Sequence, residues 1–316
     1  MATRHKNDLT EINLRKFDGS QLSFRVFVTT FLGFGANEAR RRYVQLLLDA
    51  NKNASQPESI LDNCMPHGLK STEHGATLSG TGRFDSCIQD TVPLLNKELP
   101  CPDDPCFFNG VHVPLADFKL HKFLGVSEFW YTSFDVYQLG GVYSPTTMLQ
   151  ASKKYCESSW DSIQSDHVSG KFPHVHDISR LQAQCFKSAW LLNILHKGFG
   201  FPKESMENPA STQPMFETIN DINNFTVSWT LGAMLLQVSE DMYQDHSIRL
   251  ADRHMNWQWG LAFLFFISTA IGFSLYYRRK GTVRSRWSSA QDLYEILPVS
   301  TKSRSFPGMR RSLSAL

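Results

Sequence analysis

The sequence predicts an α/β domain followed by one transmembrane helix. An alternating run rich in β-branched and aromatic residues at 23–32 indicates a strand, and helical periodicity at 36–50 and 180–197 indicates helices. The run 255–277 holds 23 residues without a formal charge. With 316 residues, the chain is long enough for one large domain or two ordinary ones.

The first predicted element is the strand at 23–32, which we expect to be covered on both faces. Gly33 and Gly35 allow a tight turn after it. A turn between a strand and the start of a helix can present backbone N–H groups to a phosphate. Gly33 and Gly35 are therefore a candidate turn near a phosphate, and the alternative is an ordinary α/β turn without a ligand.

The second predicted element is the helix at 36–50. Asn37 is a plausible N-cap, because its side chain can accept from a free N–H group of the first turn. Tyr43, Leu46 and Leu47 form one apolar stripe at helical spacing. We expect this stripe to face the core.

The middle of the chain alternates loops with short elements. Residues 51–115 are loop-rich, with a helical stretch near 88–95. The strongly aromatic run 118–137 predicts a strand followed by a helix, and 144–160 has a helical pattern. The stretch 224–237 starts as a strand and becomes a helix.

The clearest soluble helix is predicted at 180–197. Gly198 is well placed to end it in the left-handed conformation that glycine adopts easily. Five residues share its apolar face: Leu181, Cys185, Ala189, Leu192 and Leu195.

The uncharged run 255–277 predicts a membrane span. At ~1.5 Å per residue it is long enough for a bilayer core of ~30 Å, and aromatic residues stand at both ends, where membrane interfaces favour them. Five lysine and arginine residues follow between 278 and 286. The positive-inside rule therefore places the C-terminal tail in the cytosol and the preceding chain in a lumen or outside the cell.

These patterns divide the chain into five parts. We expect a polar segment at 1–22, a luminal lobe at 23–240, a juxtamembrane stretch at 241–254, the span at 255–277 and a disordered tail at 278–316.

Cysteines and sequons agree with a luminal domain. All six cysteines precede the span, which favours three disulfides in an oxidising compartment over six buried thiols. Two prolines between Cys101 and Cys106 favour a local disulfide. Asn53 and Asn224 begin glycosylation sequons. The net charge of +2 favours no polyanionic partner, and we expect no nucleic acid.

Five ordered motifs resemble the C-terminal half of the apyrases, the nucleoside triphosphate diphosphohydrolases. The likeness is closest to their membrane-bound Golgi and lysosomal members and covers about residues 24–237. The motifs are FLGFGANEARRRY at 31–43, GTGRFDSC at 80–87, GVSEFWY at 125–131, CFKSAW at 185–190 and WTLGA at 229–233.

The resemblance implies an actin-like, ribonuclease H-like fold of two lobes. A nucleotide and a divalent cation, Ca²⁺ or Mg²⁺, would lie between the lobes, and water would attack the terminal phosphate of a nucleoside di- or triphosphate such as UDP. Tyr131 and Arg180 match the positions that hold the nucleobase. The alternative for Arg180 is a salt bridge at a helix start. A Golgi or other endomembrane location would follow.

The resemblance also implies a disulfide pattern. The family pairs match Cys101 with Cys106 and Cys156 with Cys185, which leaves Cys64 with Cys87.

The family's phosphate-binding loops, Asp-Ala-Gly-Ser and Asp-Leu-Gly-Gly-Ala-Ser, do not occur in the sequence. Its catalytic glutamate segment also precedes the matched region, so we identify no catalytic residue and no metal ligand here. We expect the chain to be the C-terminal portion of a nucleotidase, beginning after the second phosphate loop, and to be inactive alone. The alternative is a non-catalytic type I membrane protein with residual nucleotide binding or an interaction role.

Overall fold

The computed structural model describes residues 9–280, apart from 17, 19, 53–58, 115–116, 119 and 208–214. The chain divides into two compact units, Met1–Ser247 and Ile248–Leu316. The sequon at Asn53 and the tail beyond 280 lie outside the described residues.

Two small mixed sheets lie in the first unit. In one sheet the order is β3-β5-β4, with β3 parallel and β4 antiparallel to β5; in the other it is β6-β8-β7, with β6 parallel and β7 antiparallel to β8. The strands are β3 (Ile60–Asp62), β4 (Lys70–Glu73), β5 (Ala76–Gly80), β6 (Phe123–Gly125), β7 (Gly141–Val142) and β8 (Phe216–Thr218).

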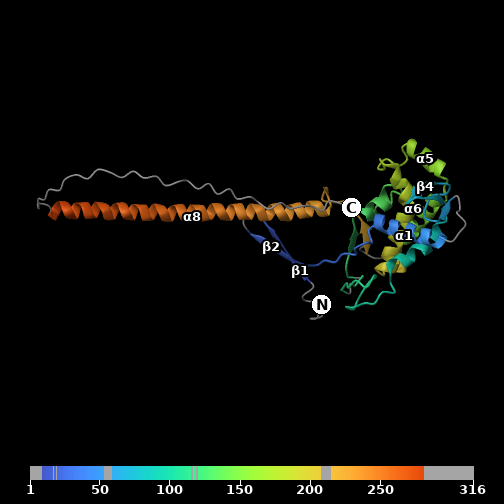
Figure 1. Cartoon of the computed structure of the whole chain (residues 1–316), viewed down its shortest axis with the longest axis horizontal. Helices are drawn as coiled ribbons and strands as arrows, with labels where there is room; N and C mark the ends of the chain where they lie inside the picture. The colour runs from blue at the N-terminus through green and yellow to red at the C-terminus, as the bar shows by residue number, and fades with distance from the viewer. Residues whose placement is uncertain are drawn as a thin grey trace. The chain divides into compact units, whose positions relative to one another are not determined.

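Helix α6 is the centre of this unit, where it packs against α1, α2, α3 and α4 (Figure 1). All five residues of its predicted apolar face are buried, which confirms that prediction. The helices are α1 (Ala36–Asn51), α2 (Phe84–Thr91), η2 (Val92–Leu95), α3 (Glu128–Phe134), α4 (Pro145–Glu157), α5 (Trp160–Val168), α6 (Ile178–Asn193), η3 (Ile194–Gly198) and α7 (Lys203–Met206).

The strand predicted at 23–32 is wrong in its bounds and its burial. It is β2 (Gln21–Phe27), and it forms an antiparallel hairpin with β1 (Leu9–Arg15), which lies inside the segment predicted only to be polar. Within the described residues the hairpin is hydrogen-bonded to neither small sheet, and Phe24 is 51% exposed. The apolar residues of β2 are therefore not covered on both faces.

Two details of the predicted helix at 36–50 are wrong. Gly35, not Asn37, is the N-cap of α1, with φ −59° and ψ 150°. Leu46 is 47% exposed, whereas Ala39, Tyr43 and Val44 are buried. Tyr43 packs on a ring of α6, and the buried stripe follows that contact in the first half of the helix.

Gly198 does not end α6 in the left-handed conformation. The helix continues as the π-helical turn η3, and Gly200 is the glycine with positive φ, at +79°. A Cβ on Gly198 would lie 3.0 Å from the ring of Phe108. Gly198 is therefore required for close packing.

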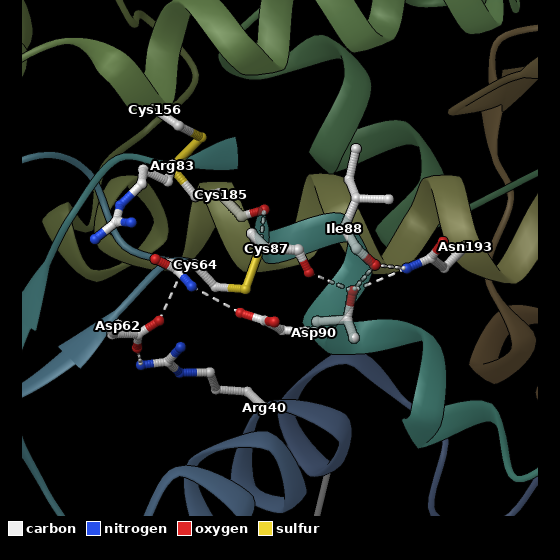
Figure 2. Close-up of a disulfide and its surroundings, with 12 residues drawn as sticks. Arg40, Asp62, Cys64, Arg83, Cys87, Ile88, Asp90, Cys156, Cys185 and Asn193 are labelled. Atoms are coloured by element: carbon white, nitrogen blue, oxygen red, sulfur yellow. Dashed lines mark hydrogen bonds and ion pairs between the residues drawn. A yellow bond between two sulfur atoms is a disulfide. The ribbon is translucent and has the colours of Figure 1, made fainter. Parts of the chain in front are cut away.

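Disulfides tie the core together (Figure 2). Cys64–Cys87 joins the loop after β3 to α2, and Cys156–Cys185 joins α4 to α6; all four residues are buried. Cys101–Cys106 closes the proline-containing loop. These are the pairs that the family resemblance implies.

A buried ion pair joins α1 to the first sheet near these disulfides (Figure 2). Arg40 Nη2 lies 2.7 Å from carboxylate oxygens of both Asp62 and Glu73. Burial disfavours the charge of Arg40, but the two carboxylates outweigh it and raise the arginine's pKa.

The last elements are a hairpin and a long helix. The strands β9 (Asp221–Ile222) and β10 (Phe225–Thr226) precede α8 (Trp229–Lys280), as predicted for 224–237. Asn224 is exposed in the two-residue turn of the hairpin, with φ +65°. Within the described residues, one helical segment is long and apolar enough to cross a membrane, Trp257–Tyr277, with mean hydropathy 1.7.

Candidate functional site

The two predicted nucleobase-binding residues lie together. Tyr131 comes from α3 and Arg180 from the first turn of α6, and Arg180 Cζ lies 5.1 Å from the centre of the Tyr131 ring. A planar guanidinium at this distance makes a cation–π contact. We call these residues the Tyr131–Arg180 pair.

The helix that carries Tyr131 is short and strongly constrained. Its N-cap, Ser127, has φ +57°, a left-handed conformation that is unfavourable for a residue other than glycine. Glu128 Oε1 accepts from Thr132 Oγ1 and from Lys187 Nζ of α6, both at 3.0 Å. These contacts tie the start of α3 to α6, the helix that also carries Arg180.

Two carboxylates fix the region around Arg180. Asp177 caps α6, accepting from the backbone N–H of Ser179 at 2.9 Å, and hydrogen bonds from Ser179 lower the pKa of Asp177. Arg180 Nη1 donates to Asp135 Oδ2 at 2.7 Å. Burial raises the pKa of Asp135 despite the opposing charge of Arg180. Arg180 therefore makes a salt bridge, as the alternative interpretation expects, and also a ring contact, and its nucleobase role stays a prediction.

Asp135 is not among the predicted site residues. Its one signal in the sequence is a spacing of four residues from Tyr131, which puts the two side chains on one face of a helix.

The Tyr131–Arg180 pair is closed against a base. Stacked bases are separated by about 3.4 Å, so a base between the ring and the guanidinium needs about 6.8 Å from one to the other. The observed 5.1 Å leaves a shortfall of about 1.7 Å. Binding in this mode therefore requires Arg180 to move away from the ring.

The predicted turn at Gly33 and Gly35 is built into the core. Gly33 has φ +85°, and its carbonyl accepts from Arg42 of α1 at 3.2 Å. The carbonyl of Phe34 accepts from the indole N–H of Trp190 at 3.0 Å. A place near a phosphate stays a prediction for Gly33 and Gly35.

A cavity of about 230 Å³ adjoins the turn at Gly35 and Ala36. Aromatic and aliphatic side chains of α6 and of the segments before α1 and after η3 form most of its wall. Its only lysine or arginine, Lys187, is already paired with Glu128. The cavity reaches α3, and among the described residues that line it no cation is unpaired.

Metal ligands do not gather in the described residues, where no group of three or more His, Cys, Asp or Glu side chains could hold an ion. The two buried aspartates, Asp62 and Asp135, are each paired with an arginine. The described residues therefore do not fit a divalent-cation site.

Comparison with known proteins identifies relatives of this chain. It is 38% identical over 249 residues to the Golgi apyrase of Saccharomyces cerevisiae, covering 75% of this chain and 39% of that protein. It is 37% identical over 245 residues to the Golgi apyrase of Schizosaccharomyces pombe, covering 74% and 42%. It is 34% identical over 263 residues to the nucleoside-diphosphatase mig-23 of Caenorhabditis elegans, covering 79% and 46%.

The chain matches less than half of the length of each of these relatives. The chain spans between 39% and 46% of the three proteins. Residues 1–251 match a single family description, so the chain belongs to the GDA1/CD39 (nucleoside phosphatase) family.

Proposed function

We propose that this chain is the nucleobase-binding portion of a membrane-bound nucleotidase that hydrolyses nucleoside di- or triphosphates, such as UDP, to the monophosphate and phosphate. The observation that carries the proposal is the Tyr131–Arg180 pair, 5.1 Å apart, in a member of a nucleoside phosphatase family. A ring and a planar guanidinium can stack on both faces of any base. Relatives named apyrase and nucleoside-diphosphatase support this substrate class.

The proposal assigns no chemical step to the described residues. The family uses a divalent cation, for which Ca²⁺ or Mg²⁺ is our choice, and such an ion would polarise a phosphoryl oxygen and neutralise developing charge. The described residues hold no cluster of ligands for it, and the phosphate-binding loops of the family do not occur in the sequence. The role of this chain is to bind and orient the base, and we expect it to be inactive alone.

Exposed apolar surfaces support a place in a larger, two-lobed, actin-like fold. The hairpin of β1 and β2 exposes Leu22 and Phe24, and the start of α8 exposes Trp229 and Met234, which are 72% and 65% exposed. An isolated two-stranded hairpin is marginal in water. Both surfaces suit burial against a further part of such a fold.

We also propose that the folded part lies in the lumen of the Golgi or another endomembrane. The disulfides support an oxidising compartment, and Golgi apyrases are among the relatives. The candidate span ends at Tyr277, immediately before Arg278, Arg279 and Lys280, which favours a cytosolic C-terminal tail. Asn224, and Asn53 outside the described residues, would then be available for glycosylation.

A second function is favoured by one specific observation. The described residues hold no cluster of metal ligands. Their two buried aspartates, Asp62 and Asp135, are both paired with arginines. The chain would then act as a non-catalytic type I membrane protein with residual nucleotide binding or an interaction role.

Hydrolysis and binding measured on the full chain test the proposal. In detergent micelles with Ca²⁺ or Mg²⁺, we expect UDP to bind without release of phosphate. Tyr131→Ala should weaken binding by about tenfold, because one base–aromatic stack is lost. The control Phe225→Ala removes an exposed ring of β10 and should leave binding unchanged. Hydrolysis of UDP by the chain alone would overturn the proposal that the chain binds without hydrolysing. If Tyr131→Ala binds UDP as tightly as the unmodified chain, the proposed base site is wrong.

A further inference from the structure

Arg180 has a partner that lies on the same helix face as the ring beneath it. Its Nη1 donates to Asp135 Oδ2 at 2.7 Å, where Asp135 is 8% exposed and the Arg180 side chain is 41% exposed. Asp135 is the C-cap residue of α3, four positions after Tyr131. One short helix therefore carries both the ring and the carboxylate that holds the cation above it.

The contact between these two side chains allows the movement that base binding needs. It runs through Nη1 alone, and Nε and Nη2 lie outside it. The guanidinium can therefore turn about this hydrogen bond without losing its carboxylate, and base binding needs the ring and the guanidinium to separate by about a further 1.7 Å. A long arginine side chain without such an anchor would lose more conformational freedom when it stacks on a base.

The ion pair between Asp135 and Arg180 does not fully offset the cost of burying the Asp135 charge. The groups that face its carboxylate are the cations Arg180 and Lys187, the ionisable His174 and the anion Glu128. Burial nevertheless raises the pKa of Asp135 above its ordinary value. Keeping the ionised form in the folded state therefore costs stability, as is common for groups at functional sites.

We propose that Asp135 is the positioning residue of the nucleobase site, holding the Arg180 guanidinium over the Tyr131 ring both in the closed pair and in the open pair with a base between them. This inference rests on the proposed function and deepens it. Asp135 acts through Arg180 and has no contact with the base in this arrangement. The ligand class is a nucleoside di- or triphosphate.

A double-mutant cycle on the full chain in detergent micelles tests this role with UDP as the probe. Asp135→Asn should weaken UDP binding by about fivefold, because a charge-assisted hydrogen bond becomes a neutral one. In the Arg180→Ala background the same change should have no further effect. The control Asp85→Asn removes a carboxylate that pairs with Lys153 between α2 and α4, and it should leave binding unchanged.

The possible outcomes separate this inference from the proposed function. Additive losses in the double variant, or unchanged binding by Asp135→Asn, would overturn the positioning role while the base site stands. Absence of UDP binding by the unmodified chain would overturn the proposed function, and the positioning role with it. The positioning role is supported if Asp135→Asn weakens UDP binding in the unmodified chain but not in the Arg180→Ala background.

The pH dependence of binding gives a second test that needs no substitution at Asp135. Uridine carries no phosphate, and its affinity should fall as the pH drops from about 7 to about 4, because protonation of the Asp135 carboxyl releases Arg180. His174→Gln should keep this fall if Asp135 causes it. A profile that is flat, or that disappears with His174→Gln, would overturn the role.

Discussion

Removal of the disulfide between α4 and α6 should cost the chain a large part of its stability. We consider the double substitution of Cys156 and Cys185 by Ala. The two residues are separated by 29 positions in the sequence, and closing a loop of this size in the unfolded chain is worth about 3.6 kcal/mol in the chain-entropy treatment. Both side chains are fully buried, so the loss of two sulfur atoms from the core adds to this cost.

The disulfide at the proline-containing loop provides the matched control. Cys101 and Cys106 are five positions apart, which gives about 2.1 kcal/mol for their double substitution by Ala. Urea unfolding of both variants in the same detergent, followed by tryptophan fluorescence, measures the two losses. The reasoning predicts that the Cys156/Cys185 variant is the less stable by at least about 1.5 kcal/mol. Equal losses, or a smaller loss for the buried pair, would refute it.

Three further outcomes are expected. Gly33→Ala should lower the free energy of unfolding in urea by about 1–2 kcal/mol, because Gly33 has φ +85°. Gly35→Ala, at φ −59° with open space around its Cβ, meets no backbone strain and should cost less than Gly33→Ala, even though alanine is a poorer N-cap than glycine. Equal losses would contradict the backbone argument. Asp135→Asn should be at least as stable as the unmodified chain in urea at about pH 7, because the raised pKa of Asp135 means that its ionisation in the folded state costs stability. The difference in the free energy of unfolding between the two chains should disappear below about pH 3.8, where the carboxyl is neutral in both the folded and the unfolded state. A large loss of stability at neutral pH would contradict this. Asn224→Gln should remove one endoglycosidase-sensitive band shift from the chain expressed in a eukaryotic secretory pathway, and an unchanged ladder of bands would exclude glycosylation in this exposed turn.

Local patterns predicted most helices but not their ends. The apolar face of α6 was predicted correctly because five apolar residues recur at helical spacing over a long element. The end of that helix was not, because the chain continues into the π-helical turn η3, where Gly198 packs against the ring of the distant Phe108, and no local pattern signals that contact. The N-cap of α1 was also misplaced, since Asn37 is a good capping residue by type but lies two positions after the N-cap, Gly35.

Burial of the first hairpin could not be predicted from alternation alone. The alternation in β2 puts Leu22, Phe24 and Val26 on one face, which is typical of a strand with one covered face. The strand nevertheless pairs only with β1 within the described residues and remains largely exposed. An alternating pattern shows which face of a strand can be buried, but it does not show which segment of the protein packs against that face.

The candidate site was predicted in part through family resemblance. Tyr131 and Arg180, 49 positions apart, were matched by motif, and their 5.1 Å contact is a property of how α3 packs on α6. Asp135 is 45 positions from Arg180, and no local pattern links an acidic residue at a helix end to a distant arginine. Contacts of this kind depend on tertiary packing.

The central claim is that this chain can hold a nucleobase but cannot hold the phosphates attached to it. Saturation-transfer NMR of UDP with the full chain tests it most directly, because it reports which ligand protons touch the protein. We expect strong saturation of the uracil ring protons and the weakest saturation at the ribose 5′ protons beside the phosphates. Stronger saturation at the 5′ protons than at the ring would contradict it.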